Sequence, residues 1–161
     1  MKRRAPNATR TAGLLIGWGN ELLGDDAAGR RVAQAVEAEA ADGVEVVDIH
    51  QLTPELALRV AETHRVIFVD ACPTTQDGFI HIEPIYASEG GGQPGVGHTG
   101  RPHDLLAMAA ELYGAQPEAW LIAVPARSFE PGEPLSESAE AGIQDAVEAA
   151  KRLLARGNID G

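Results

Sequence analysis

Apolar and polar positions alternate along this chain on two length scales. Short runs of consecutive apolar residues predict buried strands, and longer segments with apolar residues every three or four positions predict helices. The expected strands occupy residues 12–18, 44–49, 65–71, 78–87 and 119–126. The expected helices occupy residues 26–40, a segment beginning at Thr53-Pro54, a segment around 105–112, and a segment beginning near Ser136 or Ser138. Because strands and helices alternate, we expect a mostly parallel sheet covered by helices on both faces.

Some of these segments also indicate their own position in the fold. Residues 65–71 (RVIFVDA) are apolar on both faces, so we expect this strand in the centre of the sheet. Pro84 lacks the N–H needed for a sheet ladder, so we expect the strand at 78–87 near an edge. Thr53 is the expected N-cap of the second helix, with Pro54 at its first helical position. The third helix is expected to bury Leu105, Met108, Ala109 and Leu112.

The composition describes a globular protein with an excess of acidic residues. The chain has 161 residues, enough for one domain, which we place at 12–156 between tails at 1–11 and 157–161. The net charge of −11 disfavours binding to nucleic acid or to an anionic membrane surface. The single cysteine, Cys72, excludes an internal disulfide and fits a reducing compartment. No apolar run is long enough for a signal peptide or a membrane span, so we expect a cytoplasmic protein.

Polar residues gather just after the expected strands, where open α/β sheets bind their ligands. They are Asn20, Glu21, Asp25 and Asp26 after the first strand, His50 and Gln51 after the second, Asp70 and Cys72 at the end of the third, and Arg127, Ser128 and Glu130 after the fifth. The glycine-rich segment 88–102 adds His98, and His103 follows it. Two carboxylates and an imidazole suit a borderline divalent ion such as Zn²⁺ or Ni²⁺. Asp26, Asp70 and His98 are therefore candidate metal ligands.

Each of these three residues also has a purely structural explanation. Asp70 ends a buried strand, where a carboxylate needs a cation, a proton or a hydrogen bond, and the backbone of a turn also supplies that bond. Asp26 is a candidate helix N-cap, unless Asp25 caps the helix and leaves Asp26 facing the cleft. His98 is also compatible with an ordinary surface position.

Other catalytic motifs are incomplete or absent. Gly17-x-Gly19 begins like a dinucleotide fingerprint, but Leu22 occupies the third glycine position. The sequence contains no P-loop and no GxSxG nucleophile motif. Cys72 with His98 or His103 as its base is a nucleophilic alternative, although a lone cysteine after a strand usually serves packing.

Five short motifs follow one another in a distinctive order. They are LLIGWGNELLGDDAAGRRVAQAV (14–36), QLTPELA (51–57), VIFVDA (66–71), the histidine before LLAMAAELYG (105–114), and VPARSFEPGEPLS (124–136). The first fits the pattern G-x-G-N-x-L-x-x-D-D/E-x-x-G. This series resembles the [NiFe]-hydrogenase maturation proteases over nearly the whole chain, from Ala12 to Leu154.

The resemblance implies a fold, an activity and a set of site residues. The implied fold is a three-layer α/β/α sandwich around a twisted, mostly parallel five-stranded sheet of the phosphorylase/hydrolase-like kind. The implied activity is that of an endopeptidase that removes the C-terminal extension of the hydrogenase large-subunit precursor after nickel insertion. The resemblance places the metal-contacting and catalytic residues at Asp26, Asp70 and His98, with nickel carried by the substrate. Secondary candidates are Asp25 and His103, and the expected oxyanion support comes from Gly17, Gly19 and Asn20.

Two other functions stay open on the sequence alone. A nickel-recognising chaperone would bind the large subunit without cutting it, and would leave the mass of its partner unchanged. A metal-dependent amidohydrolase would hold its own Zn²⁺, and would contain stoichiometric metal after purification.

Overall fold

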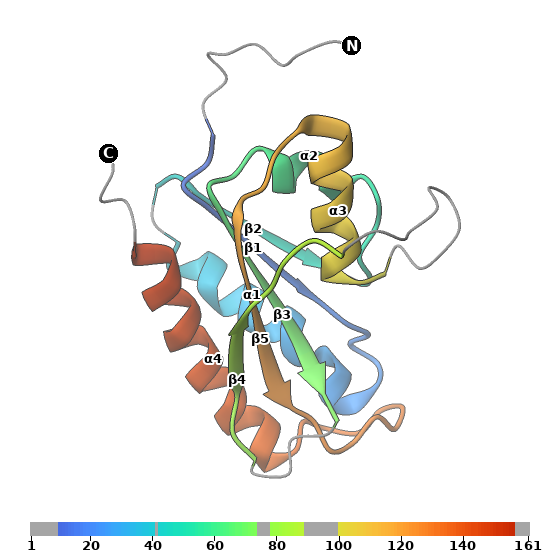
Figure 1. Ribbon diagram of the computed structural model, residues 1–161. Coiled ribbons are helices and arrows are strands. Elements are labelled where there is room, and N and C mark those ends of the chain that lie inside the picture. The colour runs from blue at the N-terminus through green and yellow to red at the C-terminus, as the bar shows by residue number, and fades with distance from the viewer. Residues whose placement is uncertain (1–9, 41, 74–77, 89–99, 157–161) are drawn as a thin grey trace.

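The structure is a computed structural model that describes residues 10–40, 42–73, 78–88 and 100–156 (Figure 1). Its strands are β1 (Gly13–Trp18), β2 (Val44–Ile49), β3 (Arg65–Cys72), β4 (His81–Pro84) and β5 (Glu118–Pro125). Its helices are the 3-10 turn η1 (Gly24–Ala27), α1 (Ala28–Ala38), α2 (Leu56–Ala61), α3 (Pro102–Tyr113) and α4 (Glu137–Ala155). None of the described helices is long and apolar enough to cross a membrane.

The strands form one sheet in the order β2-β1-β3-β5-β4. Strand β1 pairs in parallel with β2 and β3, and β3 pairs in parallel with β5. Among the described strands, β4 alone runs antiparallel, and it lies at the edge beside β5. The predictions of a mostly parallel five-stranded sheet, with 65–71 central and the Pro84 strand at the edge, are therefore confirmed. The parallel strands bring the ends of β1, β2, β3 and β5 to one edge of the sheet.

Helices cover both faces of the sheet, so the domain has three layers as expected (Figure 1). Successive residues of a strand point to opposite faces, and each face has its own core. Leu14 of β1 and Phe68 of β3 belong to the core under α2 and α3. Leu15 and Ile67 belong to the core under α1 and α4. The apolar runs that predicted buried strands therefore supply both cores at once.

Several predicted details of the helices and strands are wrong. Helix α2 begins at Leu56 without a side-chain cap, because Leu56 and Ala57 donate their N–H groups to the carbonyls of Thr53 and Pro54. Residues 24–27 form a 3-10 turn, so α1 begins only at Ala28 and ends at Ala38. The edge strand is limited to His81–Pro84.

Leu112 is not part of the buried face of α3. It is 58% exposed, because α3 ends one residue later and Gly114 turns the chain back with a φ of 67°. Ala115 fills the core position instead, and Leu106 joins Leu105 and Ala109 on the buried face. The prediction for α4 is correct, since Ser136 caps it by accepting a hydrogen bond from the N–H of Ala139.

Candidate functional site

Two glycines bring the start of α1 into direct contact with the ends of β1 and β3. A Cβ added to Gly29 would lie 2.5 Å from the carbonyl oxygen of Val69 and 2.6 Å from that of Trp18. A Cβ on Gly17 would lie 2.1 Å from the carbonyl oxygen of Gly29. Larger residues would therefore push α1 away from the sheet. This close packing places η1, with its two aspartates, beside the carboxyl end of β3.

Asp26 is held in place by the turn that follows β1. Its Oδ2 atom accepts a 2.7 Å hydrogen bond from the backbone N–H of Asn20. Gly19, which precedes Asn20, has a φ of 148°, and a Cβ there would lie 1.9 Å from the carbonyl oxygen of Asp26. Asp26 does not cap α1 with its side chain, since α1 has no side-chain cap. Its carboxylate instead braces the turn at the edge of the sheet.

Asp70 lies next to this turn, in the last part of β3. Its pKa is raised to about 6, mainly because the carboxyl group is buried. The hydrogen bond from the Ala71 N–H lowers this pKa, and the negative charge of Asp26 raises it. The negative charges of Asp26 and Asp70 are thus close enough to repel each other. The structure therefore brings together two of the three candidate ligands found in the sequence.

Asp25 has a different role from the one expected. It is fully buried and does not cap α1. Its carboxylate accepts hydrogen bonds from the backbone N–H groups of Arg127 (2.7 Å), Ser128 (3.1 Å) and Ser136 (2.7 Å), and from the Ser136 hydroxyl (2.6 Å). Burial alone would raise the pKa of Asp25, but the Ser136 hydroxyl and the backbone donors hold it below its ordinary value. The partners lie more than 100 residues away, so no local sequence pattern indicated them.

The backbone donors proposed for an oxyanion are already engaged. The Gly19 N–H donates to the carbonyls of Ile49 and His50, and the Asn20 N–H donates to Asp26. Gly17 lies inside β1, between β2 and β3. The Asn20 side chain accepts a 2.9 Å hydrogen bond from the Leu22 N–H through its Oδ1 atom, which leaves its NH₂ group as a donor. The side-chain amide of Asn20 is therefore the group of this turn best suited to an oxyanion.

Of the two candidate histidines, His98 and His103, the structure describes only His103. His98 lies outside the described residues. His103 is in the first turn of α3, with its Nδ1 atom 2.9 Å from the Tyr86 carbonyl oxygen. Within the described ranges, no three His, Cys, Asp or Glu side chains come close enough together to hold a metal ion. His103 therefore does not complete a site with Asp26 and Asp70.

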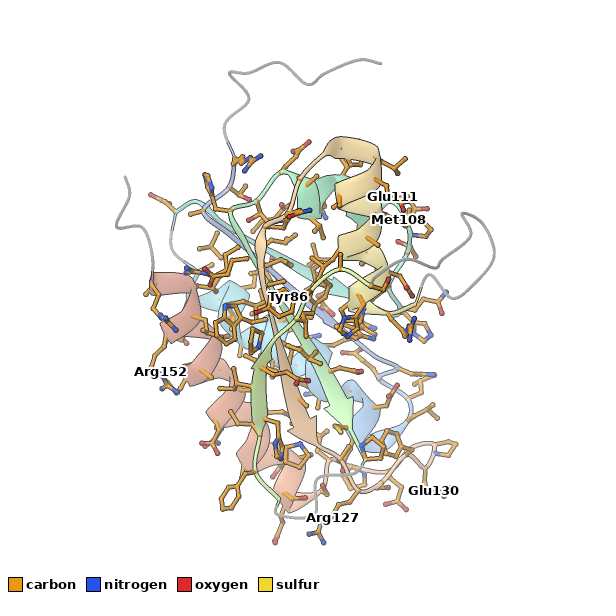
Figure 2. All side chains as sticks on the ribbon, viewed as in Figure 1. Tyr86, Met108, Glu111, Arg127, Glu130 and Arg152 are labelled. Carbon is orange, nitrogen blue, oxygen red and sulfur yellow. The ribbon has the colours of Figure 1, made fainter. Side chains whose placement is uncertain are left out.

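The segment after β5 lies beside the two aspartates at the same edge of the sheet. The Ala126 N–H donates to the carbonyl of Cys72, two residues beyond Asp70. The labelled side chains of Arg127 and Glu130 point outward from this segment, at the lower end of the molecule (Figure 2). Cys72, the single cysteine of the sequence, is the last residue of β3. The Arg127 backbone contacts the site through its hydrogen bond to Asp25.

The arrangement has well-matched relatives among solved structures. No protein-family model and no curated protein sequence matches the chain. The hydrogenase maturating endopeptidase HybD from E. coli is 26% identical, with 89% of this chain and 91% of that chain covered and a TM-score of 0.71. An endopeptidase from Escherichia coli solved in solution is 27% identical, over 89% and 91%, with a TM-score of 0.68. The maturation protease HycI from Thermococcus kodakarensis is 20% identical over 90% and 93%, with a TM-score of 0.70, and supports the shared fold alone.

Proposed function

We propose that this chain, which belongs to the [NiFe]-hydrogenase maturation protease family, is an endopeptidase that removes the C-terminal extension of a hydrogenase large-subunit precursor. The observation that carries the proposal is the pairing of Asp26 with Asp70 at the carboxyl edge of the sheet. The pairing occurs in a fold shared, over about nine-tenths of the chain, with a hydrogenase maturating endopeptidase and with a second endopeptidase. A cytoplasmic location is part of the proposal, since the lone Cys72 fits a reducing compartment.

The two aspartates are suited to contact a metal ion that arrives with the substrate. Their charges repel each other, and a divalent cation between them would relieve that repulsion. Carboxylate and imidazole ligands both suit Ni²⁺, so Asp26, Asp70 and His98 together would complete the coordination of a nickel ion held by the precursor. Such contacts would favour the nickel-loaded precursor over the nickel-free one, and would align the peptide bond to be cut.

Cleavage then requires an activated water molecule and support for the developing oxyanion. Asp70 is the better placed general base, because its pKa of about 6 is close to neutral pH. Asp26 is less free to act as a base, since its Oδ2 atom already accepts the Asn20 N–H. The Asn20 side-chain amide is the proposed oxyanion donor, and the proton taken by Asp70 would pass to the leaving amine.

The decisive experiment is an intact-mass assay on the large-subunit precursor of the same host. The purified protein is incubated with the nickel-loaded precursor and, in parallel, with the nickel-free precursor. Loss of a C-terminal peptide from the loaded form alone supports a nickel-dependent endopeptidase. A stable complex without mass loss in either form would instead identify a chaperone, and would refute the proposed activity.

A further inference from the structure

The segment between β5 and α4 is fixed to η1 and to the turn before it at several points along its length. The Asp25 N–H donates a 2.7 Å hydrogen bond to the Ser128 carbonyl, which complements the bonds that the Asp25 carboxylate accepts. The Gly132 N–H donates to the Leu22 carbonyl at 2.9 Å. Gly24 approaches so closely that a Cβ there would lie 2.6 Å from the Ser128 carbonyl oxygen. The segment 127–135 is therefore a preformed loop that packs on the turn carrying Asp26 (Figure 1).

The outer side of this loop is exposed and carries charged and aromatic side chains. Arg127, Glu130 and Glu133 are exposed, and Phe129 keeps 37% of its surface accessible although it is a large aromatic residue. A pocket of about 380 Å³ lies at the base of the loop, lined by Arg127, Ser136, Glu137 and Ser138. Two of these lining residues, Arg127 and Ser136, donate to Asp25. The carboxylate that supports the pocket is thus adjacent in sequence to the proposed catalytic Asp26.

We infer that Asp25 is a positioning residue that holds the 127–135 loop and its pocket in the shape that receives the precursor, next to the carboxylates that cut it. The inference rests on the proposed function, and it assigns the loop to substrate binding rather than to chemistry. A buried carboxylate with four donors is a rigid anchor, because each bond to a charged acceptor is strong and an unpaired charge there would be costly. Loop residues preorganised in this way avoid the entropy cost of ordering when the substrate binds.

The test is a single-turnover assay with the nickel-loaded precursor and the protease in excess. Asp25→Asn keeps the size of the side chain but turns an NH₂ group toward the donors, which releases the loop. We expect the half-saturating protease concentration to rise about tenfold, with the maximal rate within about threefold of wild type. A fall in maximal rate at unchanged half-saturation would overturn the inference, because it would show that Asp25 serves only Asp26.

A double-mutant cycle distinguishes positioning from simple stability. Phe129→Ala is expected to raise half-saturation about threefold in the wild-type background and to add almost nothing to Asp25→Asn. Glu118→Gln is the matched control, since Glu118 accepts hydrogen bonds from Arg65 and Trp120 at the amino end of β5, the end opposite to the loop. It is expected to lower stability without changing half-saturation. Fully additive effects of Asp25→Asn and Phe129→Ala would refute the inference.

Two further measurements cover the remaining outcomes. If Asp25→Asn does not fold, Ser136→Ala is used instead, because it removes only the hydroxyl donor to Asp25. This variant is expected to raise the half-saturating protease concentration as well. An unchanged half-saturating concentration would refute the inference. Hydrogen exchange of the free protein is independent of catalysis. The Arg127 and Ser128 amides are expected to exchange far faster in Asp25→Asn than in wild type, and unchanged exchange would refute the anchor. If wild type cuts neither precursor, the proposed function fails, while this measurement still reports on the anchor.

Discussion

The backbone of Gly19 and the carbonyl of Asp26 are packed so closely that no side chain fits between them. A Cβ on Gly19 would lie 1.9 Å from the Asp26 carbonyl oxygen, and the φ of 148° is one that other residues rarely adopt. The first glycine-rich turn and the acidic turn after it are thus a single structural unit. This contact determines where the Asp26 carboxylate lies relative to β3.

Replacing Gly19 by alanine is expected to destabilise the domain severely. The added methyl group meets backbone atoms that cannot move aside, so we expect a loss of at least about 2 kcal/mol in the free energy of unfolding. Gly114→Ala is the matched control, since Gly114 also has a positive φ but a Cβ there meets nothing within 4 Å. Urea unfolding of both variants checks this. If both variants lost the same free energy of unfolding, backbone strain alone would explain the destabilisation of Gly19→Ala, and the contact with Asp26 would contribute nothing.

Asp70→Asn is expected to increase stability at neutral pH while it abolishes cleavage. The folded pKa of about 6 exceeds the ordinary value of 3.8, so the stabilising effect of the protonated group is complete below pH 4 and is lost as pH rises through 6. Asparagine does not ionise, so the gain at pH 7.5 relative to pH 4 should be on the order of 2 kcal/mol. Urea unfolding at the two pH values measures it. If Asp70→Asn and wild type differed by the same free energy of unfolding at pH 4 and at pH 7.5, the raised pKa of Asp70 would be contradicted.

The two histidines are expected to respond differently to alanine substitution. His98→Ala should abolish removal of the C-terminal extension, because it removes the proposed third nickel contact. His103→Ala should retain most activity, because Nδ1 of His103 is occupied by the Tyr86 carbonyl and no described cluster joins it to Asp26 and Asp70. Intact-mass analysis of the precursor with each variant decides between them. The reverse result would assign the metal contact to His103.

Asp26→Asn is expected to prevent cleavage with little change in the fold. The amide Oδ1 of asparagine still accepts the Asn20 N–H, so the turn keeps its shape while one charge of the proposed site is lost. Circular dichroism and thermal unfolding verify the fold, and the mass assay reports the activity. Normal cleavage by this variant would remove Asp26 from the catalytic site.

The purified protein is expected to contain far less than one metal ion per chain. Two carboxylates that repel each other form an incomplete site, and the precursor is proposed to supply the nickel. Elemental analysis checks this, and treatment of the protease with a chelator, followed by its removal, should leave cleavage of the nickel-loaded precursor unchanged. Tightly held stoichiometric zinc, together with activity lost on chelation, would favour the metal-dependent amidohydrolase instead.

The sequence alone determined the elements and the layers of this protein. Apolar runs such as VIFV produce strands buried on both faces, and that local property required helices on each side of a parallel sheet. It also indicated Asp26 and Asp70, because polar residues that end adjacent parallel strands must lie at one edge. The Ser136 cap is local as well, since its hydroxyl reaches an N–H only three residues away.

The tertiary structure alone decided what each carboxylate does. Asp25 and Asp26 are adjacent in sequence and look interchangeable, yet one is fully buried against Arg127, Ser128 and Ser136 while the other braces Asn20. The role of Asp25 depends on hydrogen-bond partners over 100 residues away. The role of Asp26 depends on Gly17 and Gly29, whose missing side chains let α1 touch the sheet, and on Gly19, which packs against Asp26 itself. Long-range contacts of this kind have no local pattern, because they exist only once the sheet has brought β1, β3 and β5 together.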